Sequence, residues 1–284
     1  MTTIPPIVSI DELVDYPDAV LADVRWYLDG RSGRAAYEAG HLPGAVFVDL
    51  ERDLSTPTKP ATAGRHPFPE PDSFAAAMGS LGIGDDSTVI AYDDGGGMTA
   101  GRLVVMLRMI GRNAAVLDGG ISLWRGELMR GAGVIPEQLD FTPCAWPADR
   151  LADVDDTATL AQSDIGVVMD ARAAERYTGA VTQIDPRPGH VPGAVNAPWG
   201  ATLDPATGRF REATELREHF AALGVTDSAS ESGNVIAYCG SGVSACMNIL
   251  AMERAGLPPA RLYVASFSGW SADPEREVEL GPGR

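Results

Sequence analysis

A single cysteine in a loop of very small side chains is the clearest chemical signal in this sequence. The apolar run 235–238 leads into Cys239, the segment Gly-Ser-Gly-Val-Ser follows, and a helical pattern begins near Ala245. This order of strand, turn and helix start directs backbone N–H groups and the positive end of a helix toward one point. We expect Cys239 to be a thiolate at neutral pH, because such amides favour its charged form. The sequence therefore predicts a nucleophile here, whereas an ordinary free cysteine is a small buried packing residue.

The loop after Cys239 is expected to form an anion-binding cup. Gly240 and Gly242 permit backbone angles that a side chain forbids, so that successive amides face inward. Together with Val243 and Ser244, these glycines are candidates for binding the substrate. A cysteine-dependent phosphatase uses a similar cup but closes it with an arginine at the position that Ala245 occupies here. Because the loop carries no cation, the phosphatase interpretation is disfavoured.

Segments of the N-terminal half recur in the same order in the C-terminal half, which indicates an internal duplication. The pairs are Asp23-Val-Arg25 with Asp170-Ala-Arg172, the Gly-His-x-Pro-Gly-Ala-Val segments that start at Gly40 and Gly189, the Val-Ile-Ala-Tyr segments that start at Val89 and Val235, and the segments that end at Trp124 and Trp270. The duplication predicts two domains, residues 1–133 and 157–284, joined by a proline-rich, aperiodic linker at 134–156.

Each half alternates short apolar runs with helical patterns, which is typical of an α/β fold. In the second half we expect strands at 165–172, 194–199, 234–239 and 261–266 and helices at 213–224 and 244–256. Continuous apolar strands separated by helices predict a mainly parallel sheet covered by helices on both faces. Ligands of such sheets bind at the carboxyl ends of strands, which is where Cys239 is expected.

The first half carries the repeat without the nucleophile. Where the second half reads Val-Ile-Ala-Tyr-Cys-Gly-Ser-Gly, the first reads Val-Ile-Ala-Tyr-Asp-Asp-Gly-Gly, with Asp93 in the place of Cys239. A carboxylate cannot act as a thiolate nucleophile. We therefore expect only the second domain to be catalytic.

Composition restricts the function classes. A net charge of −17 argues against nucleic acid, which recruits clustered Lys and Arg. The sequence contains no apolar stretch of about eighteen residues and no basic region followed by an apolar one at its start, so we expect no membrane partner. Three cysteines without framework spacing suit a reducing compartment and predict a cytoplasmic protein. Cysteines and histidines show no metal-ligand spacing, and we expect neither metal nor cofactor.

The segment Tyr37-Glu-Ala-Gly-His-Leu-Pro-Gly-Ala45, the duplicated halves and the loop at Cys239 together resemble the tandem-domain sulfurtransferases of the rhodanese family. The resemblance covers nearly the whole chain. It implies two rhodanese-like domains, of which the second forms a persulfide on Cys239 and passes the outer sulfur to a thiol, a thioredoxin-like protein or cyanide. His41 and His190 occur in both halves, so we interpret them as structural.

The resemblance also bears on the sulfur donor. Family members that prefer thiosulfate tend to carry cationic residues just after the cysteine, whereas those that prefer 3-mercaptopyruvate resemble Cys-Gly-Ser-Gly-Val-Thr. The loop here differs from the second type only at Ser244, which keeps the hydroxyl. We therefore expect 3-mercaptopyruvate as the donor, with thiosulfate as the alternative. A sulfide- or redox-sensing module without turnover is a weaker alternative.

Two arginines are candidates for binding the substrate carboxylate, since a guanidinium pairs with both oxygens. Arg176 matches a substrate-binding arginine of the mercaptopyruvate enzymes, and Arg187 matches the second, although the segment that follows Arg187 is shorter than usual. Arg172 belongs to an Asp-x-Arg pattern present in both halves, so we interpret it as a structural brace.

The resemblance finally implies a proton relay. Mercaptopyruvate loses sulfur as its enolate carbon takes up a proton, and a hydroxyl beside the thiolate, that of Ser241, could transfer it. The resembling enzymes pair this serine with a histidine and an aspartate. His66 matches the histidine, and Glu51 stands where the aspartate is expected, with the same charge and one more methylene.

Overall fold

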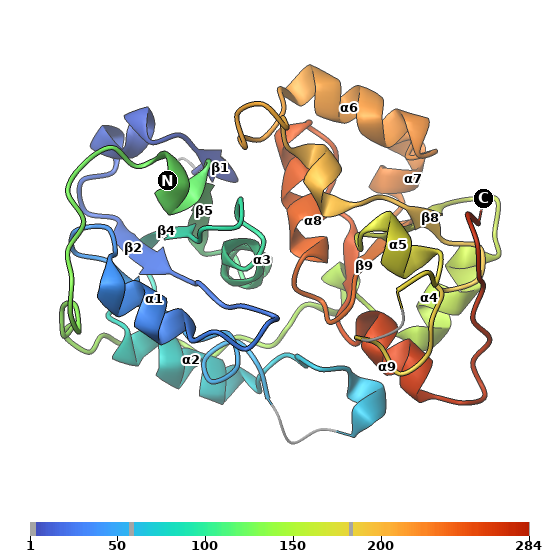
Figure 1. The fold of residues 1–284 in the computed structure, drawn as a ribbon, viewed down its shortest axis with the longest axis horizontal. Coiled ribbons are helices and arrows are strands. Elements are labelled where there is room, and N and C mark those ends of the chain that lie inside the picture. The colour runs from blue at the N-terminus through green and yellow to red at the C-terminus, as the bar shows by residue number, and fades with distance from the viewer. Residues whose placement is uncertain (1–3, 57–59, 182–183, 284) are drawn as a thin grey trace. The chain divides into compact units, whose positions relative to one another are not determined.

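The structure is a computed structural model, and it describes residues 4–56, 60–181 and 184–283. The chain forms two compact units, each built on its own five-stranded sheet (Figure 1). The first unit comprises Met1–Thr56, Pro69–Trp146 and Pro205–Arg209, and the second comprises Pro57–Phe68, Pro147–Asp204 and Phe210–Arg284.

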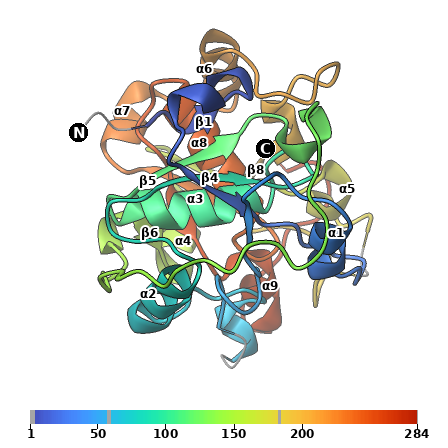
Figure 2. The ribbon, with the colours of Figure 1, turned by 90° about the vertical axis from the view of Figure 1, so that its left-hand side faces the viewer.

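The first sheet is parallel throughout, with strand order β1-β5-β4-β2-β3. Its strands are β1 (Ile7–Val8), β2 (Val20–Asp23), β3 (Val46–Phe47), β4 (Thr88–Tyr92) and β5 (Asn113–Leu117). The helices of this unit are α1 (Gly33–Ala39), α2 (Pro71–Ser80) and α3 (Ala100–Met109), with 3-10 turns η1 (Asp11–Asp15) and η3 (Gly120–Leu123). Helix α3 packs on β4 and β5, as Figure 2 shows.

The second sheet repeats this arrangement strand for strand. Its order is β6-β10-β9-β7-β8, and all its pairs are parallel. The strands are β6 (Leu151–Ala152), β7 (Val167–Asp170), β8 (Val195–Asn196), β9 (Val235–Tyr238) and β10 (Arg261–Tyr263). Because β6 to β10 take the positions of β1 to β5, the duplication predicted from the sequence is confirmed, and so is the parallel α/β fold.

Helices and short turns cover the second sheet. They are η2 (Ala61–Ala63), η4 (Ala148–Arg150), α4 (Val154–Ala161), α5 (Ala174–Tyr177), η5 (Trp199–Thr202), α6 (Ala213–Ala222), α7 (Asp227–Glu231), α8 (Ala245–Arg254) and α9 (Ser266–Ala272). Helix α8 packs on β9 and β10, while α4 packs on β7. Strand β9 is buried at every residue, which explains its continuous apolar sequence.

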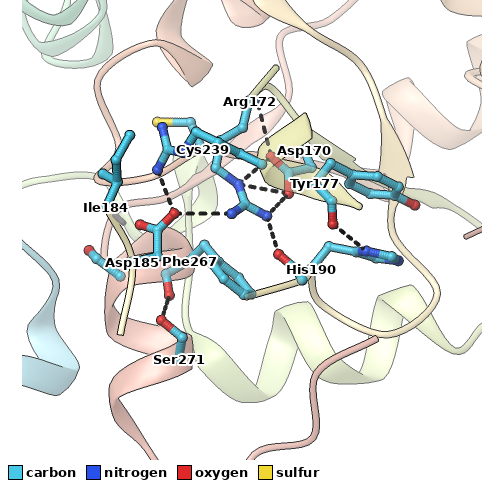
Figure 3. Close-up of polar contacts among 12 residues, drawn as sticks. Asp170, Arg172, Tyr177, Ile184, Asp185, His190, Cys239, Phe267 and Ser271 are labelled. Carbon is cyan, nitrogen blue, oxygen red and sulfur yellow. Dashed lines mark hydrogen bonds and ion pairs between the residues drawn. The ribbon is translucent and has the colours of Figure 1, made fainter. Parts of the chain in front are cut away.

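A buried ion pair braces each unit at the end of a central strand. Arg172 donates to both carboxylate oxygens of Asp170 and to the carbonyl of Gly189, and its guanidinium lies 3.9 Å from the ring centroid of Phe267 (Figure 3). In the first unit Arg25 bonds Asp23 and the carbonyl of Gly40 in the same way. The interpretation of the Asp-x-Arg pattern as a structural brace therefore agrees with its contacts.

The two histidines of the repeat also have structural contacts. The ring of His41 stacks on Tyr37 with a centroid distance of 3.9 Å, and its Nδ1 lies 2.9 Å from the Tyr37 carbonyl oxygen. His190 stacks on Tyr177 in the same manner at 3.7 Å, and Figure 3 shows the contact of its ring with the Tyr177 carbonyl. These contacts join each ring to a tyrosine of its own unit.

The units differ from the domain limits expected from the repeat in three respects. The segment Pro205–Arg209 belongs to the first unit, although it lies within the C-terminal half of the sequence. The short segment Pro57–Phe68 belongs to the second unit, although it lies within the N-terminal half of the sequence. The region 134–156 is divided: Leu139 donates a backbone hydrogen bond to Gly79 in the first unit, whereas η4, β6 and the start of α4 belong to the second. Strand β6 was not predicted, because an edge strand of two residues is too short to show a periodic pattern.

Among the described residues, no helix is both long enough and apolar enough to cross a bilayer.

Candidate active site

Cys239 follows the last residue of β9 and precedes α8, as expected. Its side chain is 2% exposed. The backbone around it is fixed by the start of α9: the N–H of Cys239 donates to Ser266 Oγ at 3.1 Å, and the Cys239 carbonyl accepts from the N–H of Phe267 at 2.9 Å. Ser266 has a φ of 52°, an uncommon conformation for a residue with a side chain. Such strain is typical of functional sites, where the surrounding structure enforces it.

The loop supplies several hydrogen-bond donors to the cysteine sulfur. Burial raises the pKa of the Cys239 thiol, but hydrogen bonds from the Ser244 hydroxyl and from the N–H groups of Ser241, Ala245 and Val243 outweigh burial, so the pKa is lowered from its ordinary value. Each of these donors stabilises the thiolate, because a hydrogen bond to the charged form favours ionisation. The cup can hold the charge of a thiolate or of a persulfide.

Gly240 and Gly242 are required in the cup for different structural reasons. Gly242 has a φ of 71°, as the argument from backbone freedom requires. Gly240 is not among the residues with positive φ, so that argument was wrong for it. A β-carbon on Gly240 would instead lie 2.6 Å from Nη2 of Arg176 and 2.7 Å from Nη2 of Arg65. Gly240 is therefore needed for space beside two guanidinium groups.

The equivalent cup of the first unit is filled by its own side chain. Both carboxylate oxygens of Asp93 accept hydrogen bonds, from the N–H groups of Gly95, Gly97, Thr99 and Ala100 and from the Thr99 hydroxyl, at 2.8–3.0 Å. The loop thus binds an anion in both units, a carboxylate in the first and the cysteine sulfur in the second. This internal comparison supports the view that the cup exists to hold negative charge.

Ser241 and His66 lie together, as the relay hypothesis requires. The Oγ of Ser241 is 2.9 Å from Nδ1 of His66, and both side chains are buried. His66 comes from the segment that the second unit takes from the N-terminal half. Glu51 belongs to the first unit, where its carboxylate accepts from Trp26 Nε1 at 3.2 Å. Its part in the relay stays a prediction.

The two arginines expected to bind substrate have different surroundings. Nη2 of Arg176 donates to Asp185 at 2.6 Å and, as described above, lies beside Gly240. Arg187 donates from Nε to the carbonyl of Ser271 at 2.9 Å and from Nη2 to that of Asp273 at 2.6 Å, at the C-terminal end of α9. This arrangement places Arg176 at the cysteine loop and gives Arg187 the contacts of a helix cap. A substrate-binding role for Arg187 stays a prediction without support from these contacts.

Sequence reasoning missed Arg65 and Asp185. Nη1 of Arg65 donates to the carbonyl of Ile184 at 2.9 Å and to Asp185 at 3.1 Å. Asp185 also accepts from Arg172 and Arg176, so three guanidinium groups share one carboxylate (Figure 3 shows the bond from Arg172). Burial alone would raise the pKa of Asp185, but Arg176, Arg172 and Arg65 outweigh burial and lower the pKa. Two cations therefore reach the neutral loop from other segments: Arg176, as predicted, and Arg65.

Within the described part of the chain, no cluster of three or more histidine, cysteine or carboxylate side chains could hold a metal ion. Cys246 lies in α8 with its sulfur 3.5 Å from the carbonyl oxygen of Gly242, and Cys144 is partly exposed. All three cysteines are free thiols.

Comparison with known protein families identifies the domains. The model of the rhodanese-like domain matches residues 9–127 and 153–273. The chain belongs to the rhodanese family. Each matched segment carries four of the five strands of one sheet, so the internal duplication is a duplication of rhodanese domains.

Sequence relatives and solved structures span nearly the whole chain. A probable 3-mercaptopyruvate sulfurtransferase of Pseudomonas aeruginosa is 38% identical over 93% of each chain. A putative thiosulfate sulfurtransferase of Mycobacterium tuberculosis is 39% identical over 92% of this chain and 90% of the relative. The crystal structure of the 3-mercaptopyruvate sulfurtransferase SseA from Escherichia coli, 31% identical, covers 93% of this chain and 99% of that chain with a TM-score of 0.78.

Proposed function

We propose that this protein is a sulfurtransferase that takes sulfur from 3-mercaptopyruvate and carries it as a persulfide on Cys239. The observation that supports the proposal most is the lowered pKa of a cysteine held in a cup of hydrogen-bond donors, at the carboxyl end of a parallel strand. One relative is named for 3-mercaptopyruvate as the donor and another for thiosulfate, and both are named sulfurtransferases. An acceptor thiol, a thioredoxin-like protein or cyanide then removes the outer sulfur. Free cysteines suit a cytoplasmic location.

The first half-reaction needs a nucleophile and a proton. The Cys239 thiolate attacks the sulfur of 3-mercaptopyruvate, a sulfur–sulfur bond forms, and the carbon–sulfur bond breaks with its electron pair moving into the enolate of pyruvate. The enolate carbon then takes up one proton, which leaves pyruvate and a persulfide anion. The donors around the sulfur suit that anion, because they suit the thiolate.

Two observations support a role for Ser241 in delivering this proton. Its hydroxyl contacts His66, and the residue follows the nucleophile by two positions. Its backbone N–H, which contacts the cysteine sulfur, is a separate function of the same residue. The hydroxyl would donate its proton to the carbon and regain one from the imidazole.

Ser241→Ala should therefore separate the two donors. We expect kcat with 3-mercaptopyruvate to fall about 100-fold, as for loss of a positioned acid, while kcat with thiosulfate changes little, because sulfite leaves without protonation of carbon. Ser244→Ala is the matched control: it removes a hydrogen bond to the thiolate and should slow both donors. Steady-state kinetics with both donors make the comparison. Equal losses with both donors for Ser241→Ala would refute the relay.

Thiosulfate is the second candidate donor. The loop sequence does not favour it, but the two arginines beside Gly240 do, because they offer positive charge to a dianion. Measuring kcat/KM of the wild-type protein for each donor decides the question. We expect the larger value with 3-mercaptopyruvate, accompanied by one pyruvate per sulfur transferred. A larger value with thiosulfate would reverse the assignment. If Cys239 accepts sulfur from a donor but the protein does not turn over repeatedly, a sensing module is favoured instead.

A further inference from the structure

We infer that Ser266 is a positioning residue for the nucleophile: its hydroxyl holds the backbone N–H of Cys239 and thereby fixes the direction of the cysteine side chain. The inference rests on the proposed function for the reaction that the cysteine performs. Three observations carry it: the backbone angle of Ser266, the contacts of its hydroxyl, and the residue that takes its place in the first unit.

Ser266 keeps a side chain in a backbone conformation that favours glycine. Its φ is 52°, and among the residues that the structure describes it is the only one other than glycine with a positive φ. In this region a β-carbon crowds the carbonyl oxygen that follows it, so a side chain lowers the stability of the fold. The residue is also fully buried. The contacts of the hydroxyl explain why a side chain is present here.

The hydroxyl of Ser266 joins the ends of two neighbouring strands. Its Oγ accepts from the N–H of Cys239, which follows β9, at 3.1 Å. The same hydroxyl donates to the carbonyl of Tyr263, the last residue of β10, at 2.9 Å. Because its hydrogen points to Tyr263, the lone pairs of Oγ face the cysteine N–H. A buried N–H without an acceptor costs free energy, so this bond favours one orientation of the peptide group that precedes Cys239.

The start of α9 holds the other side of the nucleophile through its main chain. The N–H of Phe267 donates to the carbonyl of Cys239, and the N–H of Ser268 donates to that of Gly240, both at 2.9 Å. Together with the bond to Ser266, these contacts occupy both backbone polar groups of Cys239. Fixing the peptide groups on both sides of a residue fixes the direction of its Cα–Cβ bond. The sulfur is therefore held where the donors of the loop reach it.

The first unit forms the same turn without the hydroxyl. Gly120 takes the place of Ser266 in the repeat and has the same φ of 52°. The N–H of Ile121 donates to the carbonyl of Asp93 at 3.1 Å, which repeats the bond from α9 to the cysteine. A β-carbon on Gly120 would lie 2.2 Å from the carbonyl oxygen of Asp93, so this unit leaves no room for a side chain. The turn therefore requires the backbone angle but not the serine, and the serine occurs in the unit that carries the nucleophile.

Two substitutions separate the hydroxyl from the backbone angle. Ser266→Ala and Ser266→Gly both remove the hydroxyl, but only alanine keeps a β-carbon at positive φ. We therefore expect Ser266→Gly to have the higher melting temperature of the two. Sulfur transfer should instead be impaired equally in both, because both lose the bond to Cys239. We expect kcat/KM at pH 7 to fall about 10-fold, as for loss of one hydrogen bond.

The thiol itself gives a second measurement. The rate of alkylation by iodoacetamide against pH, with Cys144 and Cys246 replaced by serine, reports the apparent pKa of Cys239. That pKa should rise in Ser266→Ala and in Ser266→Gly by the same amount, because the sulfur is no longer held in line with the donors that favour the thiolate. Steady-state rates with 3-mercaptopyruvate and with thiosulfate should fall by equal factors, since both donors react with the same sulfur.

Ser271→Ala is the matched control. Ser271 is also buried, belongs to the same helix and donates from its hydroxyl to the carbonyl of Phe267 at 2.6 Å. Its hydroxyl bonds within α9 rather than to the cysteine loop. We expect this variant to have a lower melting temperature and to keep the wild-type thiol pKa and the wild-type rates with both donors.

The two variants of Ser266 distinguish a positioning role from a purely structural one. Rates that follow the melting temperature, with Ser266→Gly close to the wild-type protein and Ser266→Ala impaired, would overturn the inference. If the wild-type protein transfers no sulfur while the thiol pKa still rises in both variants, the proposed function fails and the inference stands. If transfer is present and neither variant changes the thiol pKa or the rate, the inference fails and the proposed function stands.

Discussion

Cys239→Ser is expected to lower the rate of sulfur transfer by more than about a thousandfold with either donor, because the covalent route is lost when its nucleophile is removed. Serine is nearly isosteric with cysteine, so the cup around it should be preserved. The wild-type protein incubated with 3-mercaptopyruvate should gain the mass of one sulfur atom on the peptide that contains Cys239. The variant should gain none.

The other two cysteines supply the controls for this result. Cys246 lies seven residues later, in α8, and is buried, and Cys144 is partly exposed. The sulfur of Cys246 lies 3.5 Å from the carbonyl oxygen of Gly242, and that of Cys144 lies 3.5 Å from the carbonyl oxygen of Thr142. We expect Cys144→Ser and Cys246→Ser to retain sulfur loading and turnover. Loading of Cys144 or Cys246 in the Cys239→Ser protein, with transfer still measurable, would show that the nucleophile has been misassigned.

Replacing Arg172 with methionine is the second change with a large expected effect. The guanidinium is 1% exposed and bonds the buried carboxylate of Asp170, Asp185 and the carbonyl of Gly189. Removing one partner leaves a buried charge uncompensated, and we expect the second unit to lose about 3–5 kcal/mol of stability. Because Asp185 also loses a partner, the binding of an anionic donor should weaken as well.

Hydrogen–deuterium exchange measures this loss in each unit separately. Peptides that cover β7 and β9 should lose protection in Arg172→Met, while peptides from β2 and β4 keep theirs. Arg25→Met is the equivalent change in the first unit, where the arginine bonds Asp23 and Gly40. It should affect β2 and β4 and leave the cysteine loop protected. Protection of β7 that is unchanged in Arg172→Met would mean that the ion pair does not stabilise the sheet.

The architecture was predictable because its signals repeat. The Val-Ile-Ala-Tyr segments became β4 and β9, and the strands expected in the second half correspond to β7, β8, β9 and β10. Duplicated patterns with the same order leave few alternative topologies, and a parallel sheet follows from strands separated by helices. The elements that were missed are short. A strand of two residues such as β6, or a one-turn helix such as α5, contains too few residues to show a period.

The nucleophile was predictable for a different reason. A cysteine between an apolar run and a helix pattern has a local geometry that the sequence largely determines, and so do the loop amides that lower its pKa. The contact of Ser241 with His66 joins residues far apart in the chain, and the resemblance to the rhodanese family suggested it.

Of the cluster of Arg65, Arg176 and Asp185 beside Gly240, only Arg176 was predicted. Arg65, Arg176 and Asp185 come from separate segments and meet only through tertiary packing. Arg187 is the opposite case. The family resemblance predicted that it binds substrate, but in the structure it donates to carbonyls at the C-terminal end of α9. The only local signal for Arg65 was its position beside His66, and the value of that signal depends on knowing that the segment belongs to the second unit.

Titration of the Cys239 thiol tests the central claim most directly. The rate of alkylation by iodoacetamide, measured against pH with Cys144 and Cys246 replaced by serine, reports the fraction of thiolate. We expect an apparent pKa below the ordinary value of about 8.5 and an upward shift in Ser244→Ala, because that hydroxyl donates to the sulfur. A pKa at or above the ordinary value in the wild-type loop would contradict the account, since burial would then outweigh the hydrogen bonds.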